Sequence, residues 1–279
     1  MKATKECYHC LSRLVRQAAE LASEDPMLRA KAIEHGLRLL DGDFSLHKTS
    51  IAMATPLHRV VRAVTNNPDP YHEMKVAEVR AAEELCQSWD ADSEEDLQGY
   101  LIFAVRGNAI DFFRDMEEIK EDLAQPVEFA LDDRDKLERK LEEARNILYL
   151  ADNAGEVLFD LPLVRKLGDF APVTYVVKES PVQNDITLAD LDEFDLTERL
   201  PRVITTGTDT PGVDMALASA EFKAAFEAAD LVLAKGMGYW ETLSELAAQG
   251  RVFYLLKAKC QPVADSLGVA LNSYVALLR

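Results

Sequence analysis

The second half of the chain contains five short apolar runs, and these limit its fold more than any other feature. Each run is apolar throughout instead of alternating, which is typical of strands buried on both faces of a parallel sheet. Amphipathic segments with helical spacing separate the runs. This succession of strands and helices predicts a doubly wound, three-layer α/β/α sandwich with a largely parallel sheet. The runs are residues 147–150, 173–177, 202–206, 231–234 and 252–256.

The first half of the chain carries helix signals almost exclusively. Thr55-Pro56 and Asp69-Pro70 have the pattern of an N-cap followed by a proline at the first helical position. We therefore expect helices to begin at these two places. The change of pattern predicts an all-helical region over residues 1–125 and an α/β domain over residues 126–279.

Composition and charge exclude several classes of protein. Lysine and arginine number 31 against 49 aspartate and glutamate residues, which gives a net charge of −18. Such a surface repels nucleic acid and anionic membranes, so neither is an expected partner. We find no apolar run long enough to span a bilayer and no secretory signal, so a cytoplasmic location is expected. Four cysteines are too few for a disulfide scaffold.

Polar residues follow every predicted strand. Because ligands bind beyond the carboxyl ends of parallel strands, these residues are expected to gather at one edge of the sheet. Asp152, Asn153 and Asp185 offer the hard oxygen ligands that suit Mg²⁺ or Mn²⁺. Glycines and lysines in the same loops could hold an anion, and together the two groups predict a site for a phosphate ester and its metal. The glycines are Gly207, Gly212, Gly236 and Gly238, and the lysines are Lys178, Lys235, Lys257 and Lys259.

Each of these residues also has a structural interpretation. Asp152 and Asn153 could cap the following helix, and Glu156 could favour its N-terminus. The glycines could serve only as turn residues. Pro162 falls inside that helix and would kink or restart it.

Four motifs in this order, "LADNAGE", "QNDIT", "GTDTPG" and "KGMGYWE", resemble the damage-control phosphatase family. These are metal-dependent phosphatases formerly described only as a domain of unknown function. The upstream "RGNAIDF" and the N-terminal "CYHC" are similar to the stand-alone prokaryotic branch, and the resemblance covers essentially the whole chain. It implies a helical N-terminal region packed on a Rossmann-like domain. It also implies hydrolysis of phosphate from small metabolites, either sugar phosphates or damaged phosphorylated compounds.

Carried over to this sequence, the resemblance implies that a divalent ion (Mg, Mn, Co or Ni) binds Asp152, Asn153 and Asp185. Lys235 matches the phosphate-binding lysine of the family. With the amides around Gly236 and Gly207, it would hold the remaining phosphate oxygens. Glu156 would orient a ligand or a water molecule.

Asn108 and Asp111 lie three residues apart on one helix face, where they would either contact the substrate or pack the helix. The chemistry leaves two routes open: attack by water, or an aspartyl-phosphate intermediate on Asp152. Haloacid-dehalogenase phosphatases that use the second route carry another aspartate two residues on. Ala154 stands at that position, so we favour attack by water.

Two other functions compete with a phosphatase. The first is a non-catalytic protein that binds nucleotides or metabolites at the same sheet edge. The second is an interaction protein centred on zinc or thiol chemistry, with Cys7, Cys10 and Cys260 as ligands and His9 or Cys86 as a fourth. A single CxxC pair is weak evidence for zinc. The small phosphorylated metabolite, the metal and the oligomeric state are left unspecified by the sequence.

Overall fold

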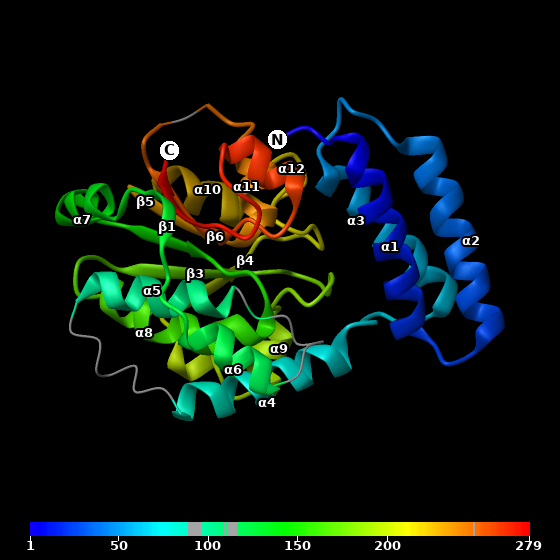
Figure 1. Cartoon of the computed structure of the whole chain (residues 1–279), viewed down its shortest axis with the longest axis horizontal. Helices are drawn as coiled ribbons and strands as arrows, with labels where there is room; N and C mark the ends of the chain where they lie inside the picture. The colour runs from blue at the N-terminus through cyan, green and yellow to red at the C-terminus, as the bar shows by residue number, and fades with distance from the viewer. Residues whose placement is uncertain (89–95, 109, 111–115, 248) are drawn as a thin grey trace.

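The computed structural model describes the whole chain except residues 89–95, 109, 111–115 and 248 (Figure 1). A seven-stranded sheet with the order β1-β7-β6-β5-β2-β3-β4 forms its centre. Neighbouring strands are parallel except for the antiparallel pair β6 and β7. The strands are β1 (Phe129–Asp132), β2 (Ile147–Leu150), β3 (Val173–Val177), β4 (Arg202–Thr205), β5 (Leu231–Lys235), β6 (Val252–Lys257) and β7 (Tyr274–Leu278).

Helices cover both faces of the sheet, which confirms the predicted sandwich. One hydrophobic core packs α4 to α9 against one face, and a second packs α10 to α12 against the other. These helices are α4 (His72–Ser88), α5 (Leu97–Gly107), α6 (Met116–Ala124), α7 (Arg134–Glu143), α8 (Val157–Leu167), α9 (Leu188–Glu193), α10 (Ala220–Ala228), α11 (Gly236–Leu243) and α12 (Gln261–Leu267). The chain also contains two short 3-10 helices, η2 (Ala154–Glu156) and η3 (Thr197–Arg199).

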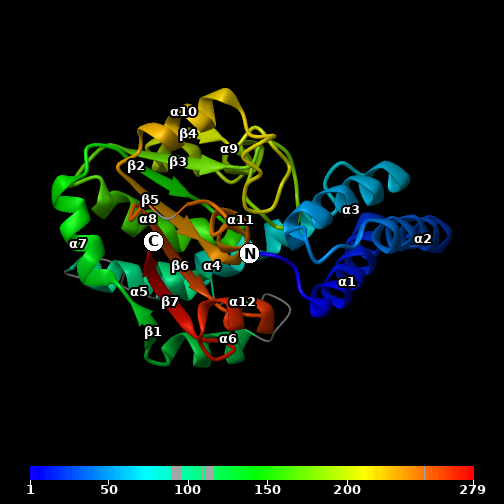
Figure 2. The same ribbon diagram turned by 90° about the horizontal axis from the view of Figure 1, so that it is seen from above.

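The first three helices form a cap beside the sheet. They are α1 (Lys5–Ala22), α2 (Pro26–Asp43) and α3 (Ser50–Thr65), and they share a third hydrophobic core of their own. Figures 1 and 2 both show them standing together at one end of the α/β body. The helices before residue 125 therefore fall into two groups, because α4 to α6 pack with the sheet. The boundary at residue 125 stays a prediction.

Two helix starts differ from expectation. Helix α3 begins at Ser50, where the Thr49 side chain accepts a hydrogen bond of 3.1 Å from the Ala52 amide, and Pro56 lies inside the helix. The expected start at Thr55 was wrong because Thr49 caps the helix two turns earlier. Pro162 likewise lies inside a continuous α8 and does not restart it.

All four residues of β2 are buried, because this strand lies between β3 and β5 near the centre of the sheet. The chain leaves β2 for β3 on one side and returns through β5 on the other. The loops after β2 and β5 therefore diverge at a topological switch point, which is the usual binding position in such sheets. No helix in the described part of the chain is both long and apolar enough to cross a membrane.

Candidate functional site

A cleft of about 250 Å³ lies between the cap and the carboxyl ends of the strands. Its floor contains Asn108, Asp152, Asn153 and Asp185. Its roof comes from α1 and α3, mainly through apolar side chains, and its sides come from α11 and the loop after β6. The three oxygen ligands expected at the sheet edge, Asp152, Asn153 and Asp185, thus meet in one cavity.

Backbone hydrogen bonds hold the loops after β2 and β3 together. The Ala154 amide donates to the Asn184 carbonyl at 2.9 Å, and the Ile186 amide donates to the Asp152 carbonyl at 3.0 Å. Between these two bonds, Asn153 and Asp185 form an isolated antiparallel bridge. The pairing therefore brings Asp185 beside Asp152, although 32 positions of sequence, including α8 and β3, separate them.

Glu156 fixes the orientation of two amide side chains. Its Oε1 accepts hydrogen bonds from Asn153 Nδ2 at 2.8 Å and from Asn108 Nδ2 at 2.9 Å. Because the Asn153 NH₂ group faces Glu156, the Oδ1 atom of the same amide is left as an acceptor for another group. Asn108 Oδ1 accepts from the Lys257 backbone amide at 2.9 Å, which ties α5 to β6 under the floor.

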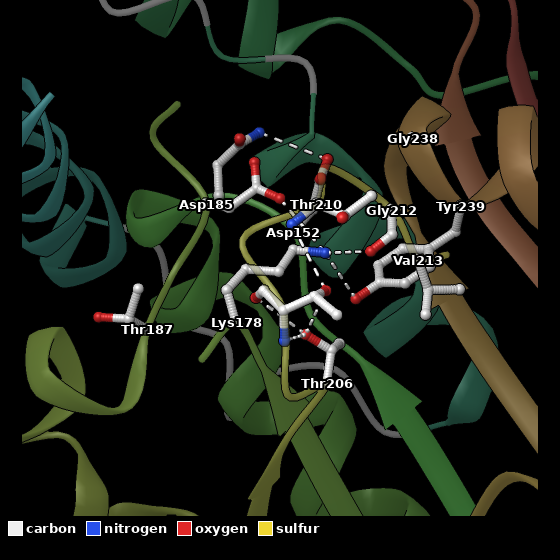
Figure 3. Close-up of polar contacts among 12 residues, drawn as sticks. Asp152, Lys178, Asp185, Thr187, Thr206, Thr210, Gly212, Val213, Gly238 and Tyr239 are labelled. Carbon is white, nitrogen blue, oxygen red and sulfur yellow. Dashed lines mark hydrogen bonds and ion pairs between the residues drawn. The ribbon is translucent and has the colours of Figure 1, made fainter. Parts of the chain in front are cut away.

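Lys178 lies beside Asp185 at the end of β3 (Figure 3). Its buried Nζ is 3.4 Å from Asp185 Oδ2 and donates to the Gly212 carbonyl at 2.5 Å and to the Tyr239 hydroxyl at 3.1 Å. Among the described residues, Asp185 Oδ2 has no hydrogen-bond partner. One buried carboxylate oxygen of the floor is therefore available to a ligand.

Negative charge on the floor is only partly compensated. Burial raises the pKa of Asp152 well above its usual range, and the charges of Glu156 and Asp185 raise it further. Burial also raises the pKa of Asp185 to about 6, although Lys178 opposes this shift. Glu156 differs, because Lys235 lowers its pKa in spite of burial. The half-buried Asp152 and the buried Asp185, beside a free amide oxygen, fit a hard divalent cation, which would relieve their repulsion.

Lys235 lies beneath the floor and does not line the cleft. Its fully buried Nζ bonds Glu156 Oε2 at 2.9 Å and Asp160 Oδ1 at 2.6 Å. Asp160 was not expected in this position, and burial raises its pKa to about 6 while Lys235 opposes the shift. The predicted role of Lys235 as a phosphate ligand stays a prediction, because the structure shows only that this lysine pairs with Glu156 and Asp160 and is not part of the lining. Lys259 is the lysine that lines the cleft, and its side chain has no ion pair among the described residues.

The glycines have different roles. Gly236 has φ +76°, and a Cβ atom there would lie 1.8 Å from Asp152 Oδ2, so only glycine lets the carboxylate sit against the start of α11. Gly207 packs against Ser219 at the start of α10 and is not part of the cleft lining. Asp111 lies outside the described residues.

Two arginines of α3 connect the cap to the loops that build the floor. Arg59 and Arg62 both form ion pairs with Asp209, in the loop after β4. Arg62 Nη1 also donates to the Pro181 carbonyl at 2.7 Å, in the loop that carries Asp185. The cap position and the position of Asp185 are therefore linked.

The cysteines do not form a three-ligand site. All four are free thiols, and Cys10 and Cys260 line the cleft. Within the described part of the chain, the group of three metal-ligating side chains close enough for one ion is Asp69, His72 and Asp190. The buried Lys75 Nζ lies 2.6 Å from both of these carboxylates, so their charge is already compensated and the group joins α4 to α9.

The fold and the cleft together define the class of protein: an α/β protein with a largely parallel seven-stranded sheet and an acidic cleft at the switch point of that sheet. The chain belongs to the family described as the damage-control phosphatase ARMT1-like domain, whose sequence profile matches residues 3–275. This confirms the resemblance found in the motifs.

Relatives match over their full length. A damage-control phosphatase of Pyrococcus horikoshii is 34% identical over 285 residues, which cover 99% of this chain and 98% of that protein. A damage-control phosphatase of Archaeoglobus fulgidus is 29% identical, with 99% of both chains covered. The crystal structure of a family protein from Pyrococcus horikoshii superposes with a TM-score of 0.91 at 33% identity, covering 100% of this chain and 99% of that one.

Proposed function

We propose that this protein is a divalent-metal-dependent phosphatase that hydrolyses phosphate monoesters of small metabolites. The observation that carries the proposal is the pair of carboxylates formed by the half-buried Asp152 and the buried Asp185, beside an Asn153 amide whose oxygen is left free by Glu156. These three residues, whose oxygen atoms can bind a metal, line a cleft of about 250 Å³, which suits a small ester. The names of the relatives support the reaction class.

Asp152, Asn153 and Asp185 would hold the cation, which when bound supplies the positive charge that phosphoryl transfer needs. Lys259, an exposed residue that lines the cleft, would bind a phosphate oxygen of the substrate. Lys178 keeps Asp185 anionic and oriented toward the floor. We favour water as the nucleophile, because the buried Ala154 offers no second carboxylate to serve an aspartyl-phosphate route.

The test is an aryl phosphate assay with Mg²⁺, Mn²⁺, Co²⁺ and Ni²⁺ on metal-stripped protein. We expect hydrolysis that depends on added metal and falls at least about a hundredfold in Asp152→Asn, since the variant loses a ligand and its charge. Asp169→Asn is the matched control, because that exposed carboxylate pairs only with Lys166 on the surface. A folded protein that hydrolyses nothing with any of the four metals would refute the proposal.

Calorimetric titration with Mn²⁺ separates this proposal from a non-catalytic binding protein. Glu156→Gln removes the anion that orients Asn153, so Mn²⁺ affinity should fall by about ten- to a hundredfold. A metabolite-binding protein that needs no metal would keep its ligand affinity in both Asp152→Asn and Glu156→Gln. Unchanged Mn²⁺ affinity in both variants would exclude this site as the metal site.

A further inference from the structure

The cleft has a second polar end, formed by Glu241 of α11 and Ser50 of α3. Gly236 opens α11 against the Asp152 carboxylate, and Glu241 follows five residues later. At 1.5 Å per residue, Glu241 lies roughly 7–8 Å further along the helix axis. Met237, Gly238 and Glu241 share the helix face that lines the cleft, so this end is continuous with the floor.

Glu241 has an unused hydrogen-bonding oxygen. The Ser50 hydroxyl donates to Glu241 Oε1, while Oε2 has no partner among the residues that the structure describes. Lys259, on the loop after β6, is the cationic side chain of the described lining. The Met1 ammonium also acts on Glu241, but it lies outside the lining, where it donates to the Glu241 carbonyl at 2.5 Å and pairs with Glu245. Burial raises the pKa of Glu241, although the Ser50 hydroxyl opposes the shift. A hydrogen-bond donor at this point would therefore be stabilised, and an anion would be repelled.

Apolar side chains cover the space between the two ends. Leu11, Ile51 and Ala54 from the cap are buried and line the cleft, with Leu14 beside them. They can pack on carbon atoms but offer no polar side-chain group. The cleft thus combines an acidic floor, an apolar roof and an acidic far wall.

Resting on the phosphatase function proposed above, we propose that Glu241 and Ser50 bind the end of the substrate opposite the phosphate. The substrate class is a phosphate monoester with a short carbon skeleton and a terminal hydroxyl or ammonium group. Esters with a second anionic group, either a carboxylate or another phosphate, are rejected at this wall. Glu241 is therefore a specificity-determining residue that does not touch the reacting phosphate.

Three esters of equal length test this proposal: hydroxybutyl, aminobutyl and carboxypropyl phosphate, compared by kcat/KM with the wild type and Glu241→Gln. We expect the wild type to prefer the hydroxyl and ammonium esters over the carboxylate ester by on the order of tenfold. Glu241→Gln should reduce the preference for ammonium over carboxylate to near unity, because the charge of the wall is gone. Glu34→Gln is the matched control, since that exposed carboxylate pairs with Arg38 on α2 outside the cleft.

The outcomes separate the two proposals. Hydrolysis of all three esters with the same ratios in the wild type and Glu241→Gln would overturn the subsite and leave the phosphatase intact. An equal loss on all three esters in Glu241→Gln would also overturn it, because a structural role alone gives that result. Absence of hydrolysis in the wild type with every metal tested would overturn the phosphatase function and the subsite with it.

Discussion

Replacing Lys235 with methionine tests whether this lysine binds phosphate or neutralises the floor. Its Nζ lies between Glu156 and Asp160, at 2.9 and 2.6 Å, and none of the three side chains is more than 2% exposed. One lysine thus compensates two buried carboxylates. Breaking a buried ion pair by removing one partner costs about 3–5 kcal/mol. At roughly 2–4 °C per kcal/mol, we expect Lys235→Met to lower Tm by about 10 °C.

A second substitution identifies the cause. In Lys235→Met, Asp160→Asn, the buried group regains the net charge that it has in the wild type. The double variant should therefore be more stable than Lys235→Met, with a coupling energy of about 0.5–3 kcal/mol in a double-mutant cycle. Thermal and urea unfolding of the four proteins measure this energy. The reasoning would be refuted if Lys235→Met kept the wild-type stability, showed no coupling to Asp160 and lost a hundredfold in kcat/KM. That result would indicate that Lys235 binds the phosphate.

Two other substitutions test local physical arguments. Gly236→Ala should cost clearly more stability than Gly250→Ala and should weaken Mn²⁺ binding, since both glycines have positive φ but only Gly236 lies against Asp152; equal costs in thermal unfolding would contradict the collision. Burial, together with the charge of Arg62, lowers the pKa of His58 from 6.5 to about 4. The folded state therefore binds fewer protons between these values, and on the order of 3 kcal/mol of stability present above pH 6.5 is lost as pH falls toward 4. His58→Leu should flatten this part of the pH dependence in urea unfolding, and an unchanged slope would exclude His58 as its source.

The central strands were predictable because burial on both faces leaves an uninterrupted apolar run. Strand β1, which lies at the edge, alternates half-buried and exposed residues, so its sequence lacks this signal. Strand β7 lies inside the sheet, but only two of its five residues are fully buried. Strand β7 pairs with β6 in the antiparallel direction, which depends on the tertiary fold and cannot be read from the sequence of β7 itself.

The sequence predicted floor residues at the strand ends, where the structure has them, but it did not predict that Lys235 would lie beneath the floor while Lys259 lines the cleft. The alternation of side chains along β5 indicates on which face of the sheet Lys235 lies. Leu231 and Leu233 belong to the core on the α8 face, so Lys235 points to that face as well and meets Glu156 and Asp160. Glu241 gave no comparable signal, because its position depends on how α3 packs against α11.

Three separate cores support different parts of the cleft. The floor of the cleft depends on the two cores that flank the sheet, whereas its roof depends on the core shared by α1 to α3. Polar links join the two parts, namely the Arg59 and Arg62 pairs with Asp209 and the hydrogen bond from Ser50 to Glu241. Substitutions in the roof can therefore change which ester fits while Asp152 and Asp185 keep their support. Under the proposed function, substitutions in the cap and on the cleft-lining face of α11 would change which small ester is bound while the floor keeps the same residues.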